Sequence, residues 1–123
     1  MKKILTVILT LLLCVVLFSC GEKEPTYESI REDYTNQMEK ETTTLVKEAK
    51  EEISDGADPY EVYAEKKEVL AKLNTKGGSE IGALYNDDTS EERVDKYKEN
   101  TAKLTDAYLH CCDDIADACN IEI

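Results

Sequence analysis

The sequence predicts an all-α protein whose folded part is a small antiparallel three-helix bundle with a broken central helix. Apolar residues recur at every third or fourth position along two long stretches, as they do on one face of a helix. No segment alternates apolar and polar residues over the length of a strand, so no sheet is expected. The two long stretches are nearly equal, and the segment between them is comparable, as in a bundle of packed helices.

The first helix is expected over residues 27–54. Glu and Lys fill the face opposite its apolar stripe. The three threonines at 42–44 are its weakest point, because β-branched side chains lower helix propensity. Asp55-Gly56 is expected to end the helix, since glycine suits the position after a helix C-cap. The stripe consists of Tyr27, Ile30, Tyr34, Met38, Leu45, Ala49 and Ile53.

The second helix is expected to begin at a clear signal: Asp58 as N-cap, Pro59 in the first helical position and Glu61 completing a capping-box-like start. Gly77-Gly78 is expected to end it. Residues 79–85 then form one or two further turns, which is why the central helix is predicted to be broken. Its stripe consists of Val62, Tyr63, Val69, Leu70 and Leu73.

The last helix carries the most regular stripe of the chain. Thr89 or Ser90 is expected to cap it, with Glu91 and Glu92 favourably placed near its positive N-terminal dipole. The apolar spacing alternates between three and four residues, which is typical of the seam of a bundle or coiled coil. The stripe consists of Val94, Tyr97, Thr101, Leu104, Tyr108, Cys111, Ile115 and Ala118.

The first twenty residues have the organisation of an export signal. Lys2-Lys3 precede an apolar run over residues 4–18, followed by Ser19 and Cys20. The run would form roughly 22 Å of helix, whereas the hydrocarbon core of a bilayer is about 30 Å thick. Residues 17–20 (Leu-Phe-Ser-Cys) resemble the lipobox of bacterial lipoproteins, although Phe18 is bulkier than the usual occupant of its position.

The resemblance implies cleavage before Cys20 and lipidation of its thiol. It divides the chain into a signal peptide (1–19), a lipidated cysteine with a short tether (20–26) and an acidic helical bundle domain (27–123). The expected location is the cell envelope, anchored to a membrane by lipid chains. Gly21 is not the aspartate that retains some lipoproteins at the inner membrane, which favours the outer membrane in a Gram-negative cell. The alternatives are a soluble export signal and an uncleaved anchor.

The charge of the chain restricts its partners. The net charge is −12, and removing residues 1–19 takes away two lysines and no acidic residue, leaving −14. Such a surface is repelled by phosphate backbones, so no nucleic acid is expected. A cationic protein would be steered toward it. The domain lacks Trp and Phe, so self-association, for example as a homodimer, could supplement a lean core.

Three cysteines remain in the last helix: Cys111, Cys112 and Cys119. Exported proteins can keep disulfides, and buried free thiols, an intrachain bridge and an intermolecular bridge all stay open. Cys112 and Cys119 would be about 10 Å apart along a straight helix, whereas a disulfide needs Cα atoms within about 7 Å. That bridge therefore requires the helix to end near residues 114–116.

No metal, cofactor or catalytic constellation is expected. His110 beside Cys111-Cys112 invites a zinc hypothesis, but His110 projects away from Cys112 and Cys119 on a helical wheel. The carboxylates at 87–88 and 113–117 lack the donor spacing of a calcium loop. With one His and no nucleophile motif, an enzyme is not expected.

The functional prediction is a non-catalytic protein–protein interaction module held at the cell envelope. Tyr60 and Tyr85 lie at the ends of elements, and exposed tyrosines are favoured at interfaces, so these two are candidate contact residues. The alternative prediction is a small-ligand or metal-binding envelope lipoprotein that uses the region from Cys111 to Cys119.

Overall fold

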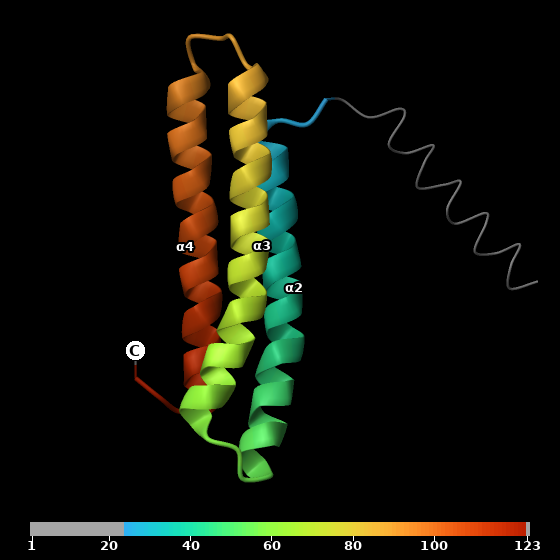
Figure 1. Cartoon of the computed structure of the whole chain (residues 1–123), viewed down its shortest axis with the longest axis vertical. Helices are drawn as coiled ribbons and strands as arrows, with labels where there is room; N and C mark the ends of the chain where they lie inside the picture. Colours follow the sequence, from blue (N-terminus) through green and yellow to red (C-terminus); the bar gives the residue numbers. More distant parts are fainter. Residues whose placement is uncertain (1–23, 123) are drawn as a thin grey trace, which may run out of the picture.

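The computed structural model describes residues 24–122, which form three long helices (Figure 1). These are α2 (Tyr27–Ser54), α3 (Pro59–Asp87) and α4 (Arg93–Cys119), and each packs against the other two. No strand occurs among the described residues. The predicted all-α three-helix bundle is therefore confirmed. The predicted signal peptide (1–19) and Cys20 lie outside the described residues.

The chain passes along the bundle three times, so α2 and α4 run parallel and α3 returns between them (Figure 1). We call the end that holds residues 24–26 and the loop 88–92 the near end. The opposite end, which holds the loop 55–58 and residues 120–122, is the far end. Each functional candidate lies at one of these ends or on a helix between them.

Helix caps explain where the elements begin and stop. Thr26, which we had placed in the tether, caps α2: its hydroxyl accepts from the Ser29 N–H at 3.0 Å, and the Ser29 hydroxyl accepts from the Thr26 N–H at 2.8 Å. Asp58 caps α3 as predicted, accepting from the Tyr60 N–H at 2.9 Å. At the other end of α2, Gly56 has a φ of 102°, a left-handed conformation that glycine adopts at little cost.

The start of α4 differs from the prediction. Neither Thr89 nor Ser90 caps it; the helix begins after Glu92, without a hydrogen bond from a capping side chain. The carboxylate of Asp88 instead accepts from the Ser90 N–H at 2.8 Å and so orders the loop. The α4 helix ends at Asn120 in the left-handed conformation, with a φ of 56°.

The prediction of a broken central helix is wrong. The α3 helix continues without interruption through Gly77-Gly78. A Cβ atom at position 77 would lie 2.9 Å from both Leu104 Cδ2 and Tyr34 Cγ, closer than van der Waals contact. Gly77 is thus required by the close approach of three helices, whereas the sequence pattern suggested a helix stop.

The core follows the predicted stripes with a few replacements. Its fully buried large side chains are Met38, Leu70, Ile81, Leu104 and Ile115, which come from all three helices. In α4, Asn100 takes the buried position that we had assigned to Thr101, and Val94 is exposed. In α2, Thr42 is also buried. Its hydroxyl donates to the Met38 carbonyl at 2.6 Å, so burial leaves this polar group with a hydrogen-bond partner in its own helix.

Two polar side chains inside the bundle are paired across helices. The Asn100 side-chain carbonyl accepts from Arg31 Nε at 2.8 Å, and its amide donates to the Lys96 carbonyl at 2.8 Å. Lys66 belongs to α3 and its side chain reaches α2, where Nζ lies 2.8 Å from Glu52 Oε2 and 3.4 Å from Glu48 Oε2. Because a buried polar group without a partner is costly, these pairs favour one register of the helices.

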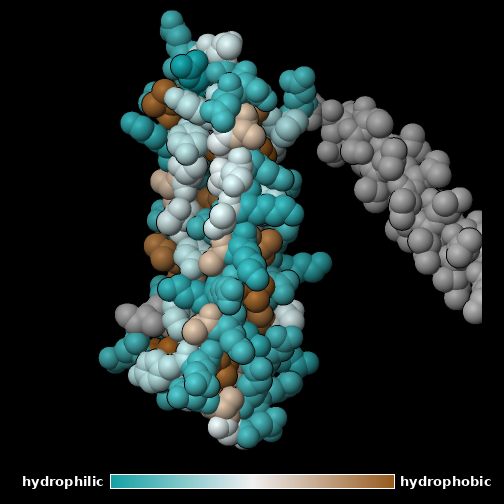
Figure 2. All heavy atoms as spheres, in the orientation of Figure 1, coloured by the Kyte–Doolittle hydropathy of each residue, from teal (hydrophilic) through white to brown (hydrophobic). Residues whose placement is uncertain are grey.

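The surface is mainly polar. On the face shown in Figure 2, hydrophilic residues predominate and the hydrophobic ones form small separated areas. Among the described helices, none combines the length and the apolar character needed to cross a membrane.

Candidate functional site

The three cysteines lie on the last three turns of α4 and are buried free thiols. Cys111 faces α2, where its sulfur is close to Thr42, whereas Cys112 and Cys119 face the side of α3 that carries Tyr63. The α4 helix continues through residues 114–116 up to Cys119. The condition we set for a Cys112–Cys119 bridge is therefore not met in this structure.

Burial controls the chemistry of these thiols. It raises the pKa of Cys111, and a hydrogen bond with Thr42 offsets part of that rise. Burial likewise raises the pKa of Cys112 and of Cys119. A thiol must lose its proton to act as a nucleophile or as a metal ligand, so all three are held in their less reactive form at neutral pH.

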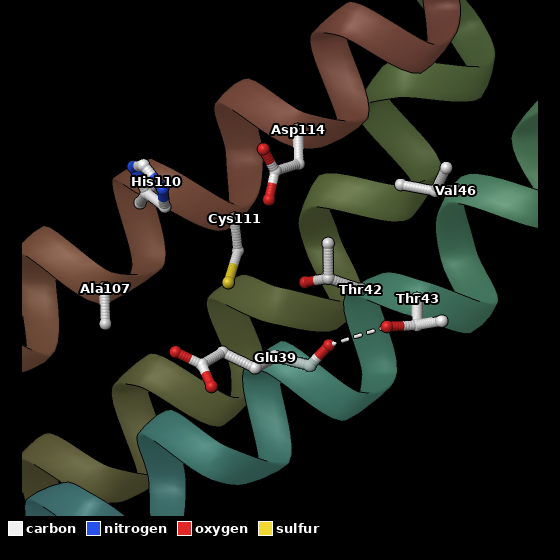
Figure 3. Close-up of a pocket in the computed structure, with 8 residues that line it drawn as sticks. All are labelled: Glu39, Thr42, Thr43, Val46, Ala107, His110, Cys111 and Asp114. Carbon is white, nitrogen blue, oxygen red and sulfur yellow. Dashed lines mark hydrogen bonds between the residues drawn. The ribbon is translucent and has the colours of Figure 1, made fainter.

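A groove with a volume of about 490 Å³ lies between α2 and α4 and includes predicted residues. Four residues of each helix line it (Figure 3): Glu39, Thr42, Thr43 and Val46 from α2, and Ala107, His110, Cys111 and Asp114 from α4. We refer to this as the α2–α4 groove. Sequence analysis singled out His110, Cys111 and the aspartates on one side of it but did not identify the groove.

His110 does not combine with the cysteines into a metal site. It is exposed on α4, and its ring points in a different direction from the Cys111 sulfur (Figure 3). Among residues 24–122, no group of three or more His, Cys, Asp or Glu side chains is arranged to hold a metal ion.

The two acidic clusters have different surroundings. Asp88 accepts from the Tyr27 hydroxyl at 2.7 Å in addition to the Ser90 N–H, so it ties the α3–α4 loop to the start of α2. These hydrogen bonds, that of the Ser90 backbone first, lower the pKa of Asp88. In the second cluster, Asp113, Asp114 and Asp117 are exposed.

The two candidate tyrosines lie at opposite ends of the bundle. Tyr60 is at the far end and is 66% exposed. Tyr85 is near the other end and is partly buried: its ring centroid is 4.9 Å from that of Tyr97, and the Arg93 guanidinium lies 5.6 Å from the ring. The two tyrosines therefore lie far apart on α3, and Tyr60 is the more exposed of the two.

Two residues that matter inside the bundle were missed from the sequence. Lys66 was not assigned to the apolar stripe, although it lies four residues from both Val62 and Leu70, which are buried. Asn100 lies four residues before Leu104 in the same way. The helical spacing alone could have identified both as buried polar groups in need of partners.

The comparisons with known proteins add no relative. No protein-family model matches the chain, and no curated protein or solved structure shows significant similarity to it.

Proposed function

We propose that this chain is a membrane-anchored bacterial lipoprotein whose helical bundle acts as a non-catalytic protein–protein interaction module at the cell envelope. The observation that carries the proposal is the sequence Leu-Phe-Ser-Cys at 17–20, placed directly after a basic start and an apolar run. The first bundle helix begins at Tyr27, so only a short tether separates the domain from Cys20.

The geometry of the described domain supports an interaction role. Its three thiols are buried, and its core is filled by side chains from all three helices. Its surface includes an exposed Tyr60 and the α2–α4 groove, on a chain with a net charge of −12. Cys111 faces α2 while Cys112 and Cys119 face α3, so the three thiols do not converge on one point, and this arrangement does not favour the ligand-binding alternative.

Lipidation is tested by mass spectrometry of the protein produced in a bacterial host. We expect the wild-type chain to begin at Cys20 and to carry a diacylglyceryl group on that sulfur. Cys20→Ser should abolish both the modification and the partition into detergent. Cys14→Ser is the matched control, because it removes a cysteine of the signal peptide and should leave processing unchanged. An unmodified terminus or an intact leader in the wild type would contradict the proposal.

The interaction role is tested by chemical crosslinking of the anchored protein in intact cells. We expect discrete heteromeric adducts that disappear when Cys20→Ser releases the domain from the membrane. Only monomers and random adducts, equal for the two proteins, would show that the anchored bundle is not an interaction module.

A further inference from the structure

We propose that the α2–α4 groove is the docking site for a basic amphipathic segment of the partner protein. An aliphatic side chain of that segment would lie on the groove floor, and neighbouring Lys or Arg side chains would lie against its acidic rim. The inference rests on the proposed function, since it assigns the surface and the partner chemistry of the same module.

The floor of the groove is apolar although it contains two threonines. The Thr42 hydroxyl donates to the Met38 carbonyl at 2.6 Å. The Thr43 hydroxyl donates to the Glu39 carbonyl at 3.3 Å, as Figure 3 shows. Both hydroxyls are thus engaged with their own helix. Their methyl groups join Val46 and Ala107 in a surface that favours an aliphatic contact.

The rim of the groove is acidic and open to a partner. Glu39 from α2 and Asp114 from α4 are exposed, and neither forms an ion pair with any described residue. Elsewhere on the bundle, several exposed carboxylates are already paired with a lysine, as Glu99 is with Lys103 at 2.9 Å. Two carboxylates that flank an apolar floor provide the charge complementarity that a basic amphipathic segment requires.

Size and charge favour this occupant over others. A volume of about 490 Å³ accommodates a few side chains, and the groove lies between two parallel helices, so a helical or extended segment can follow it. A second copy of the mature chain would bring its own Glu39 and Asp114, and a net charge of −14, against the same rim. Such like-charge contact opposes a homodimer through this surface.

The proposal is tested with a synthetic amphipathic peptide built from leucine and lysine with one tryptophan. The protein contains no Trp, so peptide fluorescence reports binding without background. The mature lipoprotein is held in nanodiscs of zwitterionic lipid, and empty nanodiscs give the contribution of the lipid. We expect saturable binding that is lost with a peptide of equal charge in which alanine replaces leucine.

Variants locate the binding surface. Glu39→Gln with Asp114→Asn should weaken binding roughly fivefold, since exposed ion pairs contribute modestly. Glu41→Gln with Asp113→Asn is the matched control: it removes the same charge from the same helices outside the groove, and it should change binding less than twofold. Ala107→Leu fills the floor without a change in charge and should weaken binding about tenfold, with circular dichroism confirming the fold.

Equal weakening by the two charge pairs, or unchanged binding by Ala107→Leu, would overturn the assignment of the groove. The outcome is separable from that of the crosslinking experiment. If adducts form in cells and persist in Ala107→Leu, the interaction module stands and the groove is wrong. If the peptide binds in the groove while no adduct forms in cells, the docking chemistry stands and the proposed function fails.

Discussion

The two ends of the bundle are stabilised in different ways. At the near end, Tyr27 hydrogen bonds to Asp88 and Tyr85 packs on Tyr97, so aromatic side chains link the start of α2 to the loop before α4. Toward the far end, the core contains three thiols and the ion-paired Lys66. The near half is joined by directional contacts between large rings, whereas the far half combines small side chains with a buried charge.

This difference indicates how a chain without tryptophan and with little phenylalanine fills a bundle. In the near half, the hydroxyl of Tyr27 reaches a polar partner at the edge of the bundle and its ring fills the interior. In the far half, Tyr63 and Tyr108 are only partly buried, and cysteine acts as a small apolar residue beside them. The stem of Lys66 supplies methylene groups there while its ammonium reaches two glutamates. The stability of the bundle should therefore depend more on changes of side-chain charge in the far half and more on changes of side-chain volume in the near half.

The largest effect is expected for Lys66→Glu in the far half. It places a third carboxylate beside Glu48 and Glu52 at a buried position, and we expect the free energy of unfolding to fall by about 3 kcal/mol. Lys66→Met is the control, because it keeps the apolar stem without the charge and should stay within about 1 kcal/mol of the wild type. Urea denaturation followed by circular dichroism measures both. Similar stabilities for the two variants would show that charge is unimportant there.

A smaller effect is expected for Gly77→Ala in the near half. The added Cβ would meet Leu104 and the ring of Tyr34 at 2.9 Å, an overpacking that typically costs about 1–3 kcal/mol. The higher helix propensity of alanine offsets about 1 kcal/mol of this cost, so we expect the free energy of unfolding to fall by about 1 kcal/mol, measured by thermal or urea unfolding. Gly78→Ala is the matched control: its Cβ meets open space, and it should stabilise the protein by up to about 1 kcal/mol. Stabilisation by both would contradict the close approach.

The smallest effect concerns alkaline pH and separates the two halves. The pKa values of Cys111, Cys112 and Cys119 are raised above 9.0 by burial, so the unfolded chain releases these protons first. Stability conferred by the neutral thiols is therefore complete below pH 9 and is lost as the pH rises above it. We expect a loss of less than about 1 kcal/mol for each thiol between pH 8 and 9.5, measured by urea denaturation with reductant.

Replacing all three thiols by alanine should flatten that loss, even though the variant is less stable at every pH. Tyr27, whose pKa is raised from 10.0 to about 12 mainly by burial, gives the corresponding signal of the near end. Because its unfolded form ionises only near pH 10, Tyr27→Phe should leave the slope below pH 9.5 unchanged. If the decrease of stability with pH changed in Tyr27→Phe and not in the variant without the three thiols, the near end and not the far half would be the part sensitive to alkaline pH.

Much of this fold could be predicted from the sequence, because local helix preferences agree with the packing of the three helices. The positions of Met38 and Ile115 follow from helical spacing, and Asp58-Pro59 marks a helix start that depends on local chemistry alone. The prediction at Gly77 was wrong because a glycine in a helical sequence can mark either the end of a helix or a close contact between helices. Which one applies depends on Tyr34 and Leu104, residues distant in sequence.

The groove was less predictable for a similar reason. Cys111, His110 and Asp114 follow one another along α4, so their proximity could be inferred. Their partners Glu39 and Thr42 come from another helix, and no sequence signal gives the offset between α2 and α4. The apolar character of the floor further depends on the rotamer of Thr42, which only the hydrogen bond to Met38 reveals.

Because the chain forms three helices, the described part begins at one end of the bundle and finishes at the other, which would fix its orientation on a membrane. A lipid on Cys20 would hold the near end close to the bilayer, while α2, with 28 residues, extends for about 42 Å. Tyr60 and residues 120–122 would then lie at the end of the domain farthest from the bilayer, and the α2–α4 groove would face sideways, along the length of the bundle. A partner could bind that side of the domain without contacting lipid.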